Sequence, residues 1–148
     1  MENLRTARVH LYKGMSYHCN GLWQSALDSY GEALRLKPDY VEAYLNMGWI
    51  YEKQGRLQDA LDTYGKALRL KPDDATAYNN VGVIYCNQGR LQDALDSYGE
   101  ALRFEPDYAE AYYNIGVVYY KRGRLQDALD SYGEALRLKP DYAKAYCN

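Results

Sequence analysis

Apolar residues recur along this chain in steps of three and four, with polar residues between them. Residues 41–74 carry two such series in succession: Tyr44, Met47 and Tyr51, and then Leu57, Ala60, Leu61, Tyr64 and Leu68. Steps of three and four place side chains on one face of an α-helix, whereas a half-buried strand would need strict alternation. The pattern therefore predicts two successive amphipathic helices and an all-α fold.

Residues at the ends of these stretches indicate where helices stop and start. Pro72 cannot continue a helix, and it disfavours helix in the residue before it. Asp73 is then predicted to cap the next helix through its carboxylate. In two other places a glutamate follows an aspartate by three residues, which is the spacing of a capping box. These pairs are Asp39 with Glu42 and Asp107 with Glu110.

The two-helix pattern returns with a fixed period. The phrase "GRLQDALD" begins at Gly55 and again at Gly89 and Gly123, 34 residues later each time, and a looser copy begins at Gly21. Each copy, counted with the helix before it, defines one of four units: residues 7–40, 41–74, 75–108 and 109–142. Residues 143–148 begin a fifth unit and are expected to form part of its first helix. Units of this size bury their apolar faces only against neighbours, so a one-dimensional stack is predicted.

The recurring residues resemble the tetratricopeptide repeat, a family with the same period. The matching positions are Tyr44, Met47, Gly48, Tyr51, Ala60, Tyr64, Ala67 and Pro72, with their counterparts in the next two units. The resemblance implies a right-handed superhelical solenoid of antiparallel helix pairs, in a single domain over residues 1–148. The first unit departs from the pattern at His10 and Lys13. Its first helix is therefore expected to pack less tightly, or to serve as a terminal cap.

Two series of glycines stand inside the predicted helices, where glycine costs about 1 kcal/mol relative to alanine. The first series is expected at the crossing of the two helices of a unit, opposite a small alanine, while large tyrosines fill the gaps between units. It comprises Gly14, Gly48, Gly82 and Gly116. The second series has no such explanation, so Gly99→Ala is predicted to stabilise the chain. It comprises Gly31, Gly65, Gly99 and Gly133.

Composition narrows the class of function. The 148 residues carry a formal net charge of −2 without a block of like charge, which argues against nucleic acid or an anionic membrane as partner. Three widely spaced cysteines match neither a zinc site nor a disulfide framework, which is typical of reduced thiols in a cytoplasmic protein. His10 and His18 are interpreted as surface or packing residues. The sequence contains no recognisable catalytic motif, so we expect that the protein is not an enzyme and binds no cofactor.

Variation between the units points to a binding surface. The second helices are near copies of one another, whereas the first helices differ, and the family resemblance implies that the first helices line a concave groove. A repeated scaffold with a varied inner face is typical of a groove that binds an extended peptide or partner segment. Drift at unconstrained exposed positions is the alternative interpretation. The varied candidates are Leu45, Asn79 and Tyr113, then Trp49, Val83 and Val117, and Tyr120.

An asparagine recurs on this face at every unit after the first. Asn46, Asn80, Asn114 and Asn148 are each separated by 34 residues. An amide offers both a donor and an acceptor, so it can pair with a peptide backbone whatever the peptide's side chains. A similar ladder holds substrate peptides in O-linked N-acetylglucosamine transferases, and this resemblance implies peptide binding. A purely structural role between repeats is the alternative interpretation.

Two other functions remain open from the residues alone. One is a self-assembling or engineered consensus-like array without a natural ligand, associating end to end through an open C-terminal end. The other is a substrate-recruiting part of a larger enzyme. The identity of a protein or peptide partner does not follow from the sequence.

Overall fold

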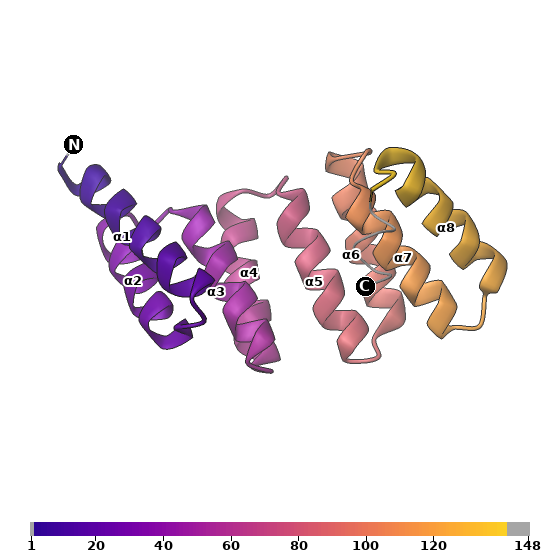
Figure 1. Ribbon diagram of the computed structural model, residues 1–148, viewed down its shortest axis with the longest axis horizontal. Helices are drawn as coiled ribbons and strands as arrows, with labels where there is room; N and C mark the ends of the chain where they lie inside the picture. The colour runs from indigo at the N-terminus through magenta and orange to yellow at the C-terminus, as the bar shows by residue number, and fades with distance from the viewer. Residues whose placement is uncertain (1, 142–148) are drawn as a thin grey trace. The chain divides into compact units, whose positions relative to one another are not determined.

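The computed structural model describes residues 2–141, and eight α-helices make up this part of the chain (Figure 1). They are α1 (Glu2–Cys19), α2 (Trp23–Leu36), α3 (Val41–Lys53), α4 (Leu57–Leu70), α5 (Ala75–Asn87), α6 (Leu91–Phe104), α7 (Ala109–Lys121) and α8 (Leu125–Leu138). The prediction of an all-α fold built from helix pairs is confirmed. The predicted partial helix at 143–148, and Asn148 with it, lies outside the described residues.

The chain consists of two compact units, Met1–Pro72 and Asp73–Asn148, and each unit contains two antiparallel helix pairs. In the first unit α1 packs on α2 and α3 on α4, and α2 also contacts α3. In the second unit α5 packs on α6 and α7 on α8, with further contacts from α7 to α5 and α6. Helices α3, α5 and α7 begin at Val41, Ala75 and Ala109, which are the first residues of the second, third and fourth repeat units.

A glycine with a left-handed backbone joins the two helices of each repeat. Gly55 has a φ of 75°, and its N–H donates to the carbonyl of Glu52 at 3.0 Å. The next N–H, of Arg56, donates to the carbonyl of Tyr51 at 2.8 Å. This pair of bonds is a Schellman motif, which satisfies helix-end carbonyls and favours glycine at the turning residue. The motif explains why "G-R-L" recurs at the start of every regular copy.

A tyrosine ring lies against the first glycine of each helix pair. A Cβ placed on Gly48 would lie 2.5 Å from Cε1 of Tyr64, and a Cβ on Gly82 would lie 2.5 Å from Cε1 of Tyr98. Tyr64 is fully buried, and Tyr98 is 1% exposed. The expected arrangement was therefore wrong in its details, because tyrosine lies opposite the glycine within the repeat. Glycine is required there because any side chain would overlap the ring.

The first repeat uses the same packing as the others. A Cβ on Gly14 would lie 2.5 Å from Cε1 of Tyr30, and Ala7 and Leu11 are buried on the same helix. His10 is partly exposed and Lys13 is exposed, so the two departures from the pattern fall away from this contact. The expectation of a looser first pair is not supported at its crossing point.

The predicted helix caps need correction. Helix α5 is capped by Asp74, not Asp73, and the Asp74 carboxylate accepts a hydrogen bond from the N–H of Ala77 at 3.0 Å. The caps of α3 and α7 are Tyr40 and Tyr108, which make no side-chain capping bond. The two predicted capping boxes therefore do not form, because each helix begins one residue later than the aspartate requires.

Candidate functional site

The predicted binding residues all lie on first helices, and they are divided between the two units. Helix α3 of the first unit carries three of them, and α5 and α7 of the second unit carry the rest. They are Leu45, Asn46 and Trp49 on α3; Asn79, Asn80 and Val83 on α5; and Tyr113, Asn114, Val117 and Tyr120 on α7. Their surroundings differ from one repeat to the next, so each unit is described by itself.

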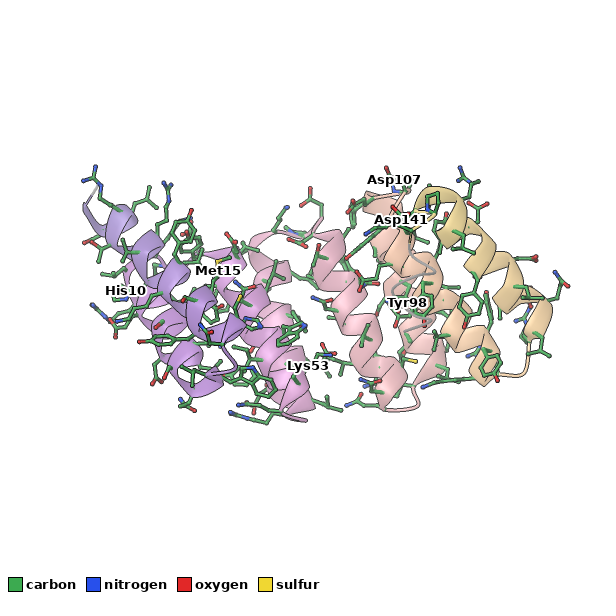
Figure 2. The ribbon with its side chains drawn as sticks, in the orientation of Figure 1. His10, Met15, Lys53, Tyr98, Asp107 and Asp141 are labelled. Atoms are coloured by element: carbon green, nitrogen blue, oxygen red, sulfur yellow. The ribbon has the colours of Figure 1, made fainter. Side chains whose placement is uncertain are left out.

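In the first unit Trp49 lies in an aromatic cluster. Its ring centroid is 4.5 Å from that of His18, and Trp23 meets it edge-on at 6.3 Å. The Nζ atom of Lys53, labelled in Figure 2, lies 5.3 Å from the Trp49 ring centroid. Trp49 is partly buried and packs on the core of this unit. The buried part of the Trp49 ring therefore contributes to the core of this unit, and only its exposed part is accessible to a partner.

His18 links this cluster to the tyrosine that fills the helix crossing. Its Nδ1 lies 3.3 Å from the hydroxyl of Tyr30. Burial lowers the pKa of His18, so the neutral imidazole is favoured. Burial first, and then the nearby Cys19 and Glu42, raise the pKa of Tyr30 to about 12. Both partners are therefore uncharged near neutral pH, and the interpretation of His18 as a packing residue fits this geometry.

In the second unit two asparagines bind each other. Asn79 is fully buried, and its Oδ1 accepts a hydrogen bond from Nδ2 of Asn114 at 3.0 Å. The remaining Asn79 amide group, Nδ2, has no hydrogen-bond partner among the described residues. Asn79 is thus inaccessible to a ligand in this structure, and its place among the exposed groove residues is corrected. The bond gives Asn114 a structural contact between α5 and α7, as in the alternative interpretation of the asparagine ladder.

The other two asparagines of the ladder that the structure describes have free side-chain amides. Asn46 and Asn80 are both partly exposed, and neither side chain makes a hydrogen bond to the described residues. The residue that binds Asn114 is an asparagine at position 79, whereas leucines occupy the corresponding places at 11 and 45. The ladder is therefore uneven, with Asn114 tied to its neighbour and the other two amides available.

Tyrosines gather on the first helix of the last repeat. The rings of Tyr113 and Tyr132 are 5.5 Å apart, and Tyr132 is the ring that lies against Gly116. Burial, followed by the neighbouring phenols of Tyr113 and Tyr120, raises the pKa of Tyr132. Tyr120 is 63% exposed, so it presents a large aromatic surface to solvent. Tyr113 is partly buried, and its ring is already engaged.

The aliphatic candidates lie deeper. Val83 and Val117 are partly buried against a core cluster that includes Cys86 and Val118. Leu45 is also partly buried. Each of these side chains can form the floor of a contact but not a protruding anchor.

Other kinds of site are not found in the described part of the chain. Residues 2–141 contain no group of three or more His, Cys, Asp and Glu side chains placed to hold a metal ion. None of the helices described combines the length and apolarity that crossing a membrane requires. The two described cysteines differ, with Cys19 exposed and Cys86 buried.

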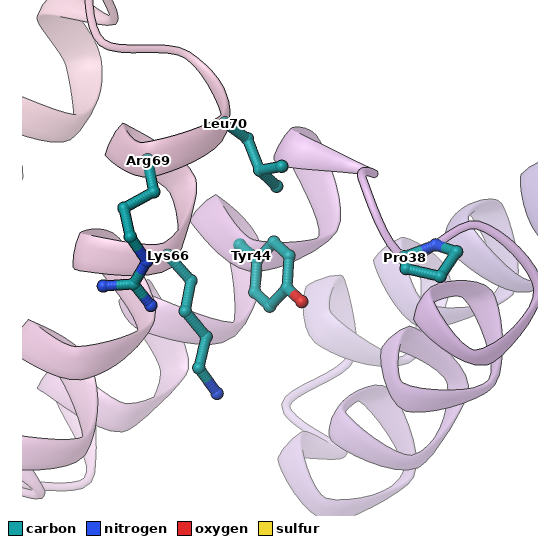
Figure 3. Close-up of a pocket in the computed structure, with 5 residues that line it drawn as sticks. All are labelled: Pro38, Tyr44, Lys66, Arg69 and Leu70. Atoms are coloured by element: carbon teal, nitrogen blue, oxygen red, sulfur yellow. The ribbon is translucent and has the colours of Figure 1, made fainter.

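A pocket in the first unit was not found from the sequence. It has a volume of about 300 Å³ and lies between α3, α4 and the connection from α2 to α3 (Figure 3). Its lining residues are Pro38, Tyr44, Lys66, Arg69 and Leu70. The signal that could have found it is Lys66, because the otherwise repeated phrase "YGEALR" reads "YGKALR" at this one copy.

The four helix pairs define a helical-repeat protein. Within it, residues 14–55, 50–89 and 82–123 match the family described as TPR repeat, and residues 109–142 match the family described as Tetratricopeptide repeat. The chain therefore belongs to the tetratricopeptide repeat family, whose members mediate protein–protein interactions.

Several solved structures resemble the chain. MamA is 27% identical, with 93% of this chain and 81% of that chain covered at a TM-score of 0.80. PilF of Pseudomonas aeruginosa is 21% identical, with coverages of 95% and 64% and a TM-score of 0.85. The TPR domain of Arabidopsis OM64 is 22% identical, with coverages of 80% and 98% and a TM-score of 0.76. The last two likenesses concern the fold alone, and no curated protein matches the chain.

Proposed function

We propose that this chain is a non-enzymatic interaction scaffold that holds an extended segment of a partner protein against its first helices. The observation that carries the proposal is the pair of partly exposed amides, Asn46 and Asn80, which make no side-chain hydrogen bond within the described residues. A polar group left free on a half-buried face is suited to pairing with the backbone of a ligand. Membership of a family of interaction proteins supports the same function.

Aromatic and aliphatic residues supply the apolar part of the proposed contact. Tyr120 offers a ring that is 63% exposed, and Trp49 offers a ring that is partly exposed. Exposed aromatic side chains are frequent anchors in protein interfaces. Leu45, Val83 and Val117 add apolar floor. Asn114 takes part through the hydrogen-bonding capacity that its bond to Asn79 leaves unused.

Alanine substitutions in a peptide-binding assay test this proposal. A ligand is first selected from a display library against the intact chain, and its affinity is then measured by calorimetry. Asn46→Ala and Asn80→Ala should each weaken binding about 2- to 10-fold, the effect of one lost hydrogen bond. Gln58→Ala, at an exposed position on α4, is the matched control and should leave affinity unchanged. Unchanged affinity in both asparagine variants would contradict pairing with the ligand backbone.

A second candidate function is self-association, and exposed leucines on α8 favour it. Leu125, Leu129 and Leu136 are 58%, 63% and 41% exposed. The corresponding residues on α2 and α6, which are leucines except for Trp23, are buried or partly buried, and α2 and α6 each pack on the next helix of their own unit. The exposed side chains of these three leucines give α8 an apolar surface that a second copy of the chain can cover.

Light scattering over a hundredfold dilution series separates self-association from peptide capture. If α8 is a docking surface, the molar mass should rise with concentration, and Leu129→Glu should return it to the monomer value. Leu70→Glu, at an exposed leucine on α4, controls for the added charge. A constant monomer mass at every concentration would reject self-association.

A further inference from the structure

The pocket of the first unit combines two cationic side chains with an apolar wall. Lys66 and Arg69 project from α4, and both are exposed. Tyr44 of α3 lies beside them, with Leu70 and Pro38 completing the lining (Figure 3). None of these five residues belongs to the asparagine face, so the pocket is a separate feature of the same unit.

The other repeats show how this surface is ordinarily neutralised. Each of them carries a glutamate three residues before the arginine, and the two side chains form an ion pair within the second helix. The pairs are Glu32 with Arg35 at 3.0 Å, Glu100 with Arg103 at 3.0 Å, and Glu134 with Arg137 at 2.9 Å. In the second repeat Lys66 stands in place of the glutamate.

The exchange leaves two positive charges unpaired. Neither Lys66 nor Arg69 makes a hydrogen bond or an ion pair with the described residues. Like charges at this spacing on a helix destabilise it slightly, whereas opposite charges stabilise it. The second repeat therefore lacks the glutamate–arginine ion pair that the other three repeats form, and the missing pair lies at the pocket.

No aromatic ring among the described residues stacks on Tyr44, which forms one wall of the pocket. In the third repeat the corresponding tyrosine, Tyr78, is covered by a stacked Phe104 ring at 5.9 Å. The second repeat has the smaller Leu70 in place of the phenylalanine. The Tyr44 hydroxyl makes no hydrogen bond to the described residues, so it is available as a further donor.

We propose that this pocket binds an acidic group on a partner protein, a phosphate or a carboxylate, through Lys66, Arg69 and the Tyr44 hydroxyl. A guanidinium forms paired hydrogen bonds with either kind of anion, and an ammonium adds a mobile charge beside it. The adjoining Tyr44 ring, Leu70 and Pro38 accommodate the apolar atoms of the side chain or segment that carries the anion. This site is independent of the asparagine face.

Three short capped peptides that differ only at the central residue serve as probes. The central residue is phosphoserine, glutamate or serine, and binding is followed by amide chemical shifts of the labelled chain at physiological salt. The phosphoserine and glutamate peptides should shift the signals of Tyr44, Lys66 and Arg69, while the serine peptide should not. The peptide that binds with the higher affinity then shows whether the pocket prefers phosphate or carboxylate.

The sister repeats supply matched variants. Lys66→Glu restores the ion pair of the other three repeats and should weaken anion binding about tenfold or more without loss of folding. Glu134→Lys makes the same exchange in the fourth repeat, which also has tyrosine and leucine at the matching places, Tyr112 and Leu138. It should create anion-dependent shifts around Arg137. Asn46→Ala should leave anion binding unchanged, which separates this site from the proposed peptide face.

Two results would overturn the proposal. One is an equal response to the serine peptide and the anionic peptides, which would show that charge is not recognised. The other is an unchanged response in Lys66→Glu, which would show that the anions bind elsewhere.

Discussion

At the scale of single residues, the chain repeats one contact and varies what surrounds it. A tyrosine ring lies against a helix glycine in every repeat, as Tyr30 does against Gly14. The first helix of each repeat places a different residue near this tyrosine ring. It is His18 beside Tyr30, the buried Cys86 in the cluster of Tyr98, and Tyr120 near Tyr132. Variation on the first helices is therefore partly an adaptation of packing and partly a change of exposed surface.

The packed histidine predicts a dependence of stability on pH. Burial lowers the pKa of His18 below its ordinary value of 6.5, so the unfolded chain binds more protons than the folded one just below that pH. The His18 contribution is therefore fully present above pH 6.5 and is lost as the pH falls toward the folded pKa. We expect the free energy of unfolding to decrease between pH 7 and pH 5 by more in the wild type than in His18→Gln. Urea unfolding at each pH measures this, and equal pH dependence in both proteins would contradict it.

At the scale of elements, each repeat is two helices joined by a Schellman turn. The turn depends on glycine at a φ near 75°, as at Gly55, because other residues are strained there. The caps are less regular, since only α5 has a side-chain cap among helices α2 to α8. Second-helix ion pairs are exposed and contribute little to stability individually. The helices are therefore held mainly by the buried faces that their neighbours cover.

Two glycines of the same repeat provide a matched pair of substitutions. Gly82→Ala would force a methyl group to within 2.5 Å of the Tyr98 ring, and overpacking of this kind costs about 1–3 kcal/mol. Gly99→Ala meets no atom within 4 Å and should stabilise α6 by up to about 1 kcal/mol. Thermal and urea unfolding should thus move in opposite directions for the two variants. A loss of stability in Gly99→Ala would show that the second glycine series has a spatial role.

At the scale of the whole molecule, the four repeats are near copies but carry different surfaces. The first unit contains the unpaired Lys66 and Arg69, and the second contains the Asn79–Asn114 bond and the exposed Tyr120. A chain built from one repeated pattern can thus offer several contacts to a partner, each set by a few exchanged residues. The tyrosine–glycine contact that all four repeats share keeps the scaffold constant while these contacts change.

The fold could be predicted because its determinants are local and recur four times. These determinants are the spacing of apolar positions by three and four residues, the helix-ending Pro72 and the recurring "G-R-L" phrase, and each acts within a few neighbouring residues. The site was less predictable. Asn46 and Asn114 occupy the same place in the repeat, yet one amide is free and the other is bonded to Asn79. That difference depends on a residue 35 positions away in sequence, and no periodicity reveals it.

The sequence by itself determined the helices, their pairing and the repeat family, because helix periodicity and a fixed repeat length restrict the chain to this arrangement. Only the tertiary structure decided which side chains remain accessible. It placed tyrosine, not alanine, against the glycines, buried Asn79, half-covered Trp49 and brought Lys66 and Arg69 to a pocket with Tyr44. The physical reason is that exposure depends on contacts between helices, and each such contact joins residues that are distant along the chain.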